Sequence, residues 1–303
     1  MSLKLSSPFG DLDFVTENFP LASKTWYKVG GPARYYLRPR TVNELRLAAS
    51  RATAEQVPIY VLGLGANLLV SDEGVNGAVF RLDEEHWRRV TRDRDMLTVG
   101  AGTDVQKLVL HCAREGLAGI ECMAGIPGTV GGVTRMNAGG KFGDFGSRVH
   151  QATVMDASGT IFTRTRDDLI FEYRKSNIVA PFILDVTIEL EPDDPERITA
   201  RTKEIWMYKR NTQPLNTKSA GCMFKNPRGL SAGALIDQTG LKGLRIGNAE
   251  VSEKHANFIV AHPGCTARDI RTLAETVRQR VHEKHGVELE TEVQFWPRPI
   301  NES

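Results

Sequence analysis

Helical periodicity marks three segments of the chain. Apolar residues recur at three- and four-residue spacing in VNELRLAASRA, in VQKLVLHCARE and in the run that follows Thr266. Each run is preceded by a threonine, at Thr41, Thr103 and Thr266, with Glu, Gln or Asp three residues later. This spacing predicts a capping box at the start of each helix. Gly116 and Gly286 are the predicted stops of the second and third helices.

Short runs of β-branched and aromatic residues lie between these helices and predict strands. Two of the runs, ATVMD and TIFTR, are separated by the turn-like tripeptide Ala157-Ser158-Gly159 and predict a hairpin. Because such hairpins are mixed with helices, we expect an α+β fold rather than a strictly alternating parallel sheet. The predicted strands are RYYLRP, VPIYVLGLG, GAVFRL, MLTVGAG, ATVMD, TIFTR, FILDVTIEL, NFIVAH and EVQFW.

The acidic segment EPDDPER, with its two prolines, interrupts this pattern and precedes a helix-like stretch that ends before Pro214. We expect a domain boundary there, with residues 1–195 forming one region and residues 196–303 a smaller C-terminal domain. A further break is expected near residues 83–95, between two subdomains of the first region. The last strand, EVQFW, follows the final helix closely, so it either completes the C-terminal domain or returns to the first region.

Length and charge narrow the class of protein. A chain of 303 residues is long enough for about two domains. The 39 Lys and Arg residues against 37 Asp and Glu leave a net charge of +2, which is too balanced for the basic surface of a nucleic-acid or anionic-membrane binder. The N-terminal residues lack a signal-peptide pattern and no apolar run is long enough to span a bilayer, so we expect a cytoplasmic protein without membrane insertion. The sequence leaves the oligomeric state open.

The cysteines and histidines do not predict a metal site. Cys112, Cys122, Cys222 and Cys265 form no C-x-x-C pair, which argues against a zinc knuckle and against a redox dithiol. The segment HEKH, residues 282–285, resembles a zinc-protease motif, but its histidines are three residues apart where that motif needs four. We therefore expect no bound metal.

Two glycine-rich stretches are candidates for holding a phosphate group. Gly63-Leu64-Gly65 follows an apolar run, but Leu68 stands where a dinucleotide-binding fingerprint needs glycine, and LLVSD continues like a strand. A Rossmann fold is therefore disfavoured. The second stretch, GIPGTVGG at residues 125–132, exposes backbone N–H groups because glycine has no side chain, and this suits a pyrophosphate. Tight turns between strands are the alternative interpretation.

Eight motifs, taken in chain order, resemble the UDP-N-acetylenolpyruvoylglucosamine reductase family. They are TWYKVGGPA, GLGANLLVSD, GIPGTVGG, MNAG, YRKS, KSAGCMFKNP, LIDQTGLKG and LETEVQFW, and they extend from about residue 23 to residue 296. No long insertion separates YRKS from KSAGC, which resembles the shorter, second type of this family.

The resemblance implies a fold and a reaction. The fold is an FAD-binding domain like that of vanillyl-alcohol oxidase, built from two α+β subdomains, followed by a smaller C-terminal α+β substrate domain. The reaction is the NADPH-dependent, FAD-mediated reduction of UDP-N-acetylglucosamine enolpyruvate to UDP-N-acetylmuramate in peptidoglycan precursor synthesis. FAD is the implied cofactor, NADPH the hydride donor, and a small-molecule UDP-sugar the substrate.

The resemblance also implies that Arg174 and Glu292 are catalytic. Arg174 in YRKS matches the family arginine, and its guanidinium is shaped to grip a carboxylate whose negative charge grows during the reaction. Glu292 in LETEVQFW matches the family glutamate, which would polarise the same carboxylate. Glu288 and Glu290 alternate with it along the strand and represent the alternative, ordinary solvent-facing carboxylates.

Cys222 is the third catalytic residue that the resemblance implies, and it departs from the family pattern. The family usually has a serine proton donor where this chain has Cys222 in SAGC. A thiol, with an ordinary pKa of about 8.5, is a far better acid than a serine hydroxyl, so Cys222 can supply the proton. Two alternatives stay open: Cys222 as a small buried apolar residue, and Ser219 as the donor.

The remaining residues that the motifs imply bind the cofactor or the substrate. Those expected to contact FAD are Gly63, Gly65, Ala66, Asn67, Leu68, Ser71, Gly125, Ile126, Pro127, Gly128, Thr129, Gly131, Gly132, Asn137 and Ala138. Those expected to contact the sugar nucleotide are Tyr173, Asn226 and Gln238, with Lys209 or Arg210 near the diphosphate. Two other functions remain possible at this point, an FAD-dependent oxidase of an alcohol or sugar and a non-catalytic nucleotide-binding scaffold.

Overall fold

The structure is a computed structural model that describes residues 7–297, and the chain forms two compact units. Unit 1 comprises the residues up to Phe19, Ala33–Gly63 and Asn76–Trp206. Unit 2 comprises Pro20–Pro32, Leu64–Val75 and the residues from Met207 onward. The chain therefore passes from one unit to the other at 19/20, 32/33, 63/64, 75/76 and 206/207.

The first sheet of unit 1 has the strand order β1-β2-β5-β3, and β3 is parallel to β5. Helix α1 (Val42–Ala54) buries Leu45 and three alanines in the same cluster as Phe80 of this sheet. The hydroxyl of Thr41 accepts the N–H of Glu44 at 3.2 Å, so the predicted cap is confirmed, although the Glu44 carboxylate reaches back to the N–H of Arg40 instead. The strands are β1 (Val15–Pro20), β2 (Pro32–Leu37), β3 (Ile59–Val61) and β5 (Val75–Phe80).

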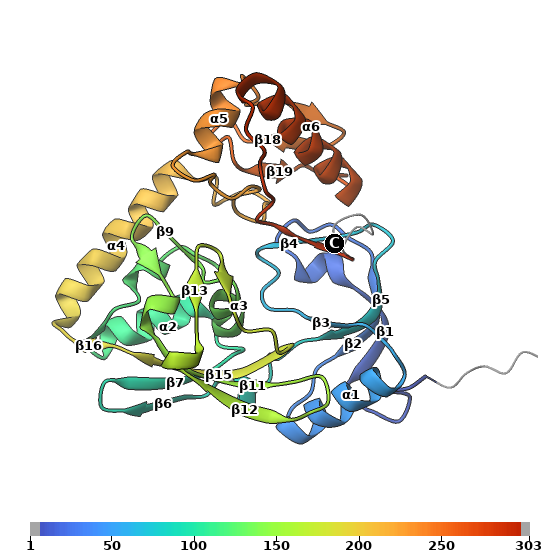
Figure 1. Cartoon of the computed structure of the whole chain (residues 1–303), viewed down its shortest axis with the longest axis vertical. Coiled ribbons are helices and arrows are strands. Elements are labelled where there is room, and N and C mark those ends of the chain that lie inside the picture. The colour runs from blue at the N-terminus through green and yellow to red at the C-terminus, as the bar shows by residue number, and fades with distance from the viewer. Residues whose placement is uncertain (1–6, 298–303) are drawn as a thin grey trace, which may run out of the picture. The chain divides into compact units, whose positions relative to one another are not determined.

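The second sheet of unit 1 is antiparallel, in the order β12-β11-β15-β7-β6. Figure 1 shows helices α2 and α3 on one side of this sheet, and their apolar residues share one buried cluster with strands β7, β11 and β15. The predicted hairpin is confirmed, because β11 and β12 pair with Met155 opposite Ile161. The bounds are β6 (Val90–Asp93), β7 (Met96–Gly100), β11 (Val149–Met155), β12 (Ile161–Thr165), β15 (Phe182–Glu189), α2 (Val105–Arg114) and α3 (Val130–Arg135).

The predicted cap of α2 at Thr103 is wrong by one residue. Asp104 is the capping residue, and one of its carboxylate oxygens accepts the N–H groups of Gln106 at 2.8 Å and Lys107 at 3.2 Å. An acidic side chain at this position also complements the positive end of the helix dipole. Gln106 is therefore released from the predicted capping box and bonds elsewhere.

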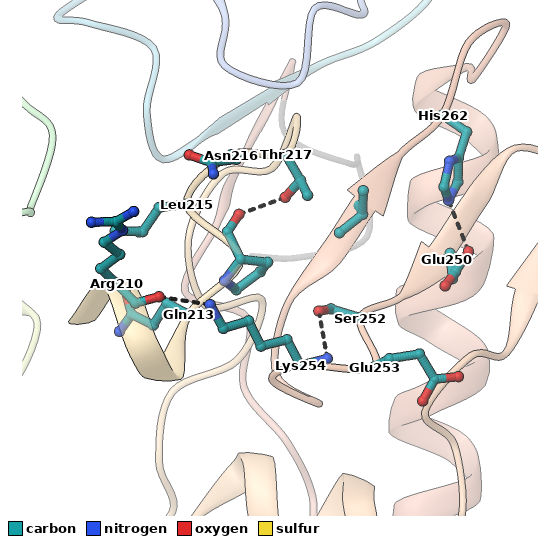
Figure 2. Close-up of a pocket in the computed structure, with 12 residues that line it drawn as sticks. Arg210, Gln213, Leu215, Asn216, Thr217, Glu250, Ser252, Glu253, Lys254 and His262 are labelled. Atoms are coloured by element: carbon teal, nitrogen blue, oxygen red, sulfur yellow. Dashed lines mark hydrogen bonds and ion pairs between the residues drawn. The ribbon is translucent and has the colours of Figure 1, made fainter. Parts of the chain in front are cut away.

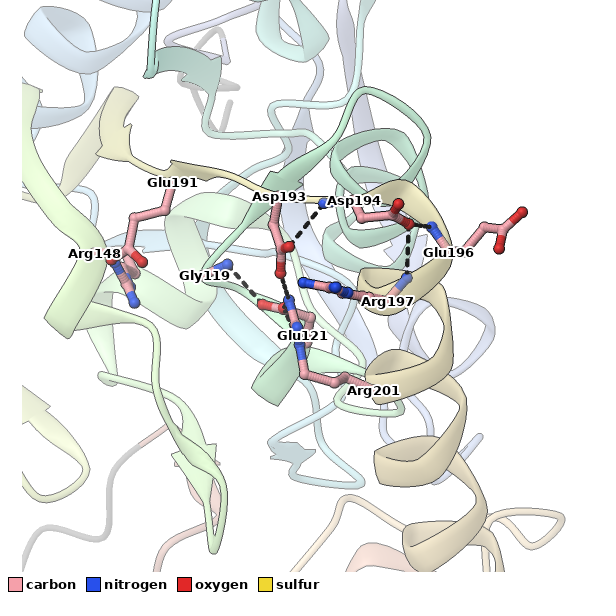
Figure 3. A network of polar contacts seen from close by, with 9 residues as sticks. All are labelled: Gly119, Glu121, Arg148, Glu191, Asp193, Asp194, Glu196, Arg197 and Arg201. Atoms are coloured by element: carbon pink, nitrogen blue, oxygen red, sulfur yellow. Dashed lines mark hydrogen bonds and ion pairs between the residues drawn. The ribbon is translucent and has the colours of Figure 1, made fainter.

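Helix α4 (Pro195–Thr212) begins in unit 1 and ends in unit 2, so the structure divides the chain differently from the boundary expected at 195/196. Pro195 is the first residue of the helix, where its missing N–H costs nothing, and Pro192 lies in a strand that pairs with Leu117, so these prolines do not mark a linker. Figure 3 shows that this segment is fixed to unit 1: Arg201 forms ion pairs with Glu121 at 2.8 Å and Asp193 at 2.7 Å. The short pairs that complete unit 1 are β8 (Leu117–Ala118) with β16 (Glu191–Pro192), β9 (Gly139–Gly140) with β10 (Gly143–Asp144), and β13 (Phe171–Glu172) with β14 (Lys175–Ser176).

Unit 2 combines a three-stranded sheet, two helices and one parallel strand pair. The sheet has the antiparallel order β17-β18-β19, and α5 and α6 bury apolar residues in the same cluster as its strands. The predicted capping box at Thr266 and the stop at Gly286 of α6 are both confirmed. The bounds are β17 (Arg245–Ile246), β18 (Ala249–Val251), β19 (Ile259–Ala261), α5 (Ala232–Gln238), α6 (Ala267–His285), β4 (Leu68–Val70) and β20 (Gln294–Trp296).

The early segments of the chain are integral parts of unit 2. Strand β20 pairs in parallel with β4, which settles the position of the last strand: it returns to residues 68–70, and these belong to unit 2. Tyr27 and Leu69 are buried in the same cluster as α6. A Cβ on Gly31 would lie 2.3 Å from the carbonyl oxygen of Asp72, so only glycine allows these two segments to approach this closely. No helix within residues 7–297 is both long and apolar enough to cross a membrane.

Asp72 caps helix α6 from a distant part of the sequence, and its removal should destabilise unit 2. Its two carboxylate oxygens accept the N–H groups of Ala267 at 2.8 Å and Arg268 at 3.0 Å. We expect Asp72→Ala to lower the free energy of unfolding by about 1 kcal/mol, measured by urea denaturation. Asp72→Asn keeps one acceptor oxygen and should lose less. Equal stability of Asp72→Ala and the parent chain would show that water replaces the cap without cost.

Candidate active site

Four of the predicted FAD-contacting residues line one cavity in unit 1. Gly63 follows β3, and Thr129, Gly131 and Gly132 lie at the start of α3. A Cβ on Gly63 would come within 2.9 Å of Oγ1 of Thr129, and one on Gly131 within 2.9 Å of Cβ of Ala101. Glycine at these positions therefore keeps the cavity walls free of side chains and brings backbone to its surface.

The polar groups of this cavity suit an anion. Arg135 lines the cavity and donates to the carbonyl oxygens of Ile178 at 2.7 Å, Ala180 at 2.6 Å and Pro181 at 2.9 Å. Burial lowers the pKa of Arg135 below its ordinary value, but within residues 7–297 no carboxylate pairs with its charge. Arg135 lies between the GIPGTVGG and MNAG motifs and belongs to neither, so no motif predicts it. An uncompensated cation in a cavity walled by glycine fits the pyrophosphate of FAD.

The rest of the GIPGTVGG segment is held rigidly by its neighbours. The side chain of Gln106 donates to the carbonyl oxygens of Met123 at 2.8 Å and Ile126 at 2.6 Å, and it accepts the N–H of Gly125 at 2.8 Å. The N–H of Val105 donates to the carbonyl of Gly128 at 3.0 Å. The N–H of Val130 donates to the carbonyl of Thr103 at 2.9 Å. These bonds fix four backbone groups of the segment, those of Gly125, Ile126, Gly128 and Val130. A preorganised loop binds a ligand without a large ordering cost.

The predicted FAD contacts from Gly65 to Ser71 lie in unit 2, where several of their groups have structural partners. Gly65 has a φ of +66°, and a Cβ there would lie 2.3 Å from the carbonyl oxygen of Lys24. The amide of Asn67 donates to the carbonyl oxygen of Glu292 at 2.9 Å. The hydroxyl of Ser71 contacts the Glu73 carboxylate. Ala66 and Leu68 lie between these anchored residues, so this motif has a structural role within unit 2.

Arg174 lies at the tip of the β13–β14 hairpin in unit 1, next to Tyr173. Its backbone φ of +57° lies in the left-handed region, which residues other than Gly, Asn and Asp rarely adopt. Its guanidinium lies 4.9 Å from the centre of the half-exposed Tyr173 ring. A non-glycine residue held in this region is a common feature of functional sites. The hairpin therefore presents a cation and an aromatic ring at one tip.

Asparagine and serine side chains hold the base of this hairpin. Asn137, which is 3% exposed, donates to the carbonyl oxygen of Glu172 at 2.9 Å and accepts the N–H of Gly146 at 2.8 Å. The hydroxyl of Ser176 donates to the carbonyl oxygen of Arg135 at 2.7 Å. Any contact of Asn137 with FAD would thus come from its backbone, because its side-chain nitrogen bonds to the hairpin and its side-chain oxygen to Gly146. Ala138 follows it and packs against the core cluster of unit 1.

Cys222 and Glu292 lie on adjacent extended segments of unit 2. The N–H of Glu292 donates to the carbonyl oxygen of Met223 at 2.8 Å, and Phe224 forms a bridge with Thr291. Both candidate residues are partly buried. The structure therefore brings together two of the three predicted catalytic residues, while Arg174 belongs to unit 1.

Neighbouring residues of the same types differ from the two candidates. Glu290 is mostly exposed and pairs with Lys225 at 2.5 Å, as expected for an ordinary carboxylate. Cys112 is buried in the core of unit 1, and burial raises its pKa to about 12. Burial also raises the pKa of Cys265 to about 11. Cys222 stays the candidate donor because it precedes Met223, whose carbonyl oxygen accepts the N–H of Glu292.

Asn226 and Gln238 flank helix α5. The side-chain oxygen of Asn226 accepts the N–H of Ala232 at 3.0 Å, so it helps to fix the start of the helix. Gln238 is the last residue of α5, is exposed, and accepts the ammonium of Lys284 on its carbonyl at 2.6 Å. No group of three His, Cys, Asp or Glu side chains in the described part of the chain is arranged to hold a metal ion.

A second cavity lies in unit 2 and contains two cationic side chains, Arg210 and Lys254 (Figure 2). Burial opposes ionisation of Glu250 at its wall, but hydrogen bonds from Arg245 and His262 lower the pKa of this carboxyl below its ordinary value. His262 contacts Glu250 at 2.8 Å. The negative charge of Glu250 is offset by Arg245, which leaves Arg210, Lys254 and Glu253 as the other charged side chains of the wall. The other residues of its wall are Gln213, Pro214, Leu215, Asn216, Thr217, Ser252, Glu253 and Val260.

Comparison with known proteins finds a family match for each of two parts of the chain. The profile of the FAD binding domain family matches residues 33–165, and that of the UDP-N-acetylenolpyruvoylglucosamine reductase C-terminal domain matches residues 213–296. UDP-N-acetylenolpyruvoylglucosamine reductase 2 of Symbiobacterium thermophilum is 40% identical over 98% of this chain and 96% of its own. The corresponding reductase of Moorella thermoacetica is 40% identical over 93% of both chains. The crystal structure of the reductase from Thermus caldophilus, 39% identical, superposes with a TM-score of 0.78 over 93% of this chain and 98% of its own.

The fold and the family matches together define an FAD-binding oxidoreductase. An FAD-binding domain of the vanillyl-alcohol-oxidase type and a smaller C-terminal domain, both α+β, are confirmed. The chain belongs to the UDP-N-acetylenolpyruvoylglucosamine reductase family. The predicted flavoprotein reductase of peptidoglycan precursor synthesis, with FAD as cofactor and NADPH as hydride donor, is confirmed. These matches leave the alcohol oxidase and the non-catalytic scaffold without support.

The left-handed backbone conformation of Arg174 predicts how substitutions there change the free energy of unfolding, independently of catalysis. Glycine adopts a positive φ without steric cost, so Arg174→Gly should be more stable than Arg174→Ala by about 1 kcal/mol. At Lys175, in the adjacent strand β14, the order should be reversed, because glycine in a regular strand loses more conformational entropy than alanine. Urea denaturation of the four variants measures both differences. If Arg174→Ala is the more stable of the first pair, the hairpin tip does not keep this conformation in solution.

Proposed function

We propose that Arg174, Cys222 and Glu292 carry out the chemistry of enolpyruvyl reduction on the sugar nucleotide in this chain. The observation that supports this proposal most strongly is the hydrogen bond of 2.8 Å from the N–H of Glu292 to the carbonyl of Met223, next to Cys222. It places a carboxyl group and a thiol on neighbouring segments of the domain that matches the reductase family. A proton donor and a carboxyl side chain are the two groups that this domain must supply.

The cavity of unit 1 holds FAD in this proposal. Gly63, Thr129, Gly131 and Gly132 would form its backbone wall, and Arg135 would offset the charge of the pyrophosphate. The other predicted contacts of that loop, Gly125, Ile126, Pro127 and Gly128, would keep the wall rigid. When bound, FAD supplies the hydride that it has received from NADPH.

Arg174 stabilises the negative charge that develops on the substrate carboxylate and the adjacent carbon. Asn137 and Ser176 fix the base of the hairpin that carries this guanidinium. Fixed charges of this kind lower the barrier because they need no reorganisation when the charge appears. Tyr173, beside the guanidinium, would contact the sugar nucleotide at the same tip.

Cys222 donates its proton to the carbon next to the carboxylate, while hydride is added to the terminal vinyl carbon. One C–H bond forms at each carbon, the S–H bond of Cys222 breaks, and the thiolate regains a proton from solvent. In its protonated form Glu292 donates a hydrogen bond to the substrate carboxylate and so favours the enol form before the carbon is protonated. Asn226 and Gln238, at the two ends of α5, are proposed as contacts of the sugar nucleotide in the same unit.

The cavity shown in Figure 2 is proposed to hold the diphosphate of the substrate. Arg210 lines it at the end of α4, and Lys254 donates to the carbonyl oxygen of Arg210 at 2.6 Å. Charge-assisted hydrogen bonds from a guanidinium are well suited to diphosphate oxygens. Lys209, almost fully buried, lies next to Arg210 in the same helix.

Half-reactions separate these roles. Arg174→Ala and Glu292→Ala should slow substrate-dependent reoxidation of the reduced flavin by about 100-fold or more, because they remove groups that act on the developing charge. NADPH-dependent flavin reduction should stay within about twofold of the parent. Anaerobic stopped-flow absorbance of the flavin measures both steps. Equal loss in the two half-reactions would contradict the assignment.

The same measurement tests Cys222. Cys222→Ala should slow reoxidation by about 100-fold, whereas Cys222→Ser should retain most of the activity because a hydroxyl restores the donor usual in the family. If Cys222→Ala is reoxidised at the parent rate, the thiol has only a structural role, and Ser219 becomes the next candidate.

Arg210→Ala tests the diphosphate cavity. Loss of a charge-assisted contact made equally in the ground state and the transition state should raise KM for the sugar nucleotide by about 10-fold and leave kcat nearly unchanged. Arg271→Ala, which removes an exposed arginine on α6 that pairs with Glu275, is the matched control and should leave KM unchanged. An unchanged KM in Arg210→Ala would exclude this cavity as the diphosphate site.

A further inference from the structure

One buried asparagine makes an unusual set of hydrogen bonds beside Cys222. Asn257 is 2% exposed and lies between β18 and β19 in unit 2. Its side-chain oxygen accepts the N–H of Phe224 at 2.9 Å, and its side-chain nitrogen donates to the carbonyl oxygen of the same residue at 2.7 Å. Its own carbonyl oxygen accepts the N–H of Met223 at 2.7 Å. A single residue therefore satisfies three of the four backbone polar groups of the two residues that follow Cys222.

The fourth group is satisfied by the segment that carries Glu292. The carbonyl oxygen of Met223 accepts the N–H of Glu292 at 2.8 Å, and the N–H of Lys225 donates to the carbonyl of Glu290 at 2.8 Å. Met223 and Phe224 are buried, so an unpaired N–H or C=O here would carry a large desolvation cost. The segment after Cys222 is thus held between Asn257 on one edge and the Glu292 segment on the other.

We propose that Asn257 is the positioning residue for the Cys222 thiol. This inference rests on the proposed role of Cys222 as proton donor. The amide side chain acts in place of a neighbouring strand and fixes the segment in register with Glu292. Only an amide offers a donor and an acceptor in one plane with this spacing; a carboxylate would face the Phe224 carbonyl with a second oxygen. Because proton transfer requires close contact between donor and carbon, a displacement of about 1 Å is enough to slow it by about 100-fold.

A double-mutant cycle tests this inference in the full-length, FAD-loaded protein. Asn257→Ser removes the paired hydrogen bonds, and we expect it to slow substrate-dependent flavin reoxidation by about 10-fold or more while NADPH-dependent reduction stays within about twofold. In a Cys222→Ala background the same change should slow reoxidation by less than about twofold, because a residue that acts through Cys222 has no effect once the thiol is absent. Asn76→Ser is the control, since Asn76 is exposed in unit 1 and its side-chain oxygen accepts a hydrogen bond from Arg34 at 3.1 Å.

The possible outcomes separate this inference from the proposed function. Full additivity of Asn257→Ser and Cys222→Ala, or equal loss in both half-reactions, would overturn the inference and leave the role of Cys222 intact. A Cys222→Ala variant that is reoxidised at the parent rate would overturn the donor role of Cys222 and the inference with it.

A measurement on the parent protein covers the case in which Asn257→Ser does not fold. Amide hydrogen exchange should place the N–H groups of Met223, Phe224 and Glu292 in the same slowly exchanging class, because they belong to one buried network. Exchange of the Phe224 N–H at the rate of an exposed loop would show that the Asn257 amide does not hold it, and would overturn the inference.

Discussion

Backbone hydrogen bonding around Glu292 is the constraint on which the geometry of unit 2 depends. The N–H of Glu292 donates to the carbonyl oxygen of Met223. The carbonyl oxygen of Glu292 accepts a hydrogen bond from the side-chain amide of Asn67. Burying extended backbone is costly unless each N–H and C=O is paired. The segments of Asn67, Met223 and Glu292 are therefore stable only when all three are packed together. This requirement explains why residues from the beginning of the chain belong to the unit that its last residues complete. A side chain that needs a fixed position can be carried on such a segment without depending on a loop.

In unit 1, side chains rather than neighbouring strands supply the hydrogen-bond partners of some backbone N–H and C=O groups. The loop of Met123–Gly125 is too irregular to pair with a sheet, and Gln106 supplies the partners that a strand would otherwise give. Asn137 does this for the hairpin that presents Arg174. Both residues lie on or beside short helices packed on the five-stranded sheet, so a rigid core fixes the two parts of unit 1 that are proposed to meet the cofactor and the substrate.

The elements with strong periodic patterns could be predicted from the sequence, and those that depend on distant partners could not. Helices α1 and α6 and the β11–β12 hairpin carry their signals locally, in a capping residue or an alternating run. Two-residue strands such as β13 and β14 have too few residues to produce a pattern. The sequence also could not predict that the boundary between the units lies within α4, because acidic residues and prolines are as typical of a helix start as of a linker. Local sequence does not record that residues 20–32 and 64–75 complete the C-terminal unit.

The motifs located the candidate site but not the direction of its side chains. Asn67, Ser71 and Asn137 stand in glycine-rich motifs that imply FAD contacts, yet hydrogen bonds within the protein engage their side chains. Conversely, Arg135 carries the charge of the cavity and falls between two motifs. Asn257 had no local signal, because its partners are 33 residues away along the chain. Residue type and spacing indicate which chemistry is present, whereas the network of partners determines which atoms remain available for it.

The long separation between partners in unit 2 affects the order in which the protein can be made and folded. The bond from Asn67 to Glu292 spans 225 residues, whereas the last segment of unit 1 ends at Trp206. During synthesis on the ribosome, unit 1 can therefore become compact while apolar residues such as Tyr27 and Leu69 still wait for their packing partners. The packing partners of Tyr27 and Leu69 in this cluster include residues between 220 and 293, which are made after unit 1 is complete. Slow translation over the last hundred codons would lengthen the time for which these apolar side chains are exposed. A dependence of the nascent chain on chaperones would arise during this stage of synthesis.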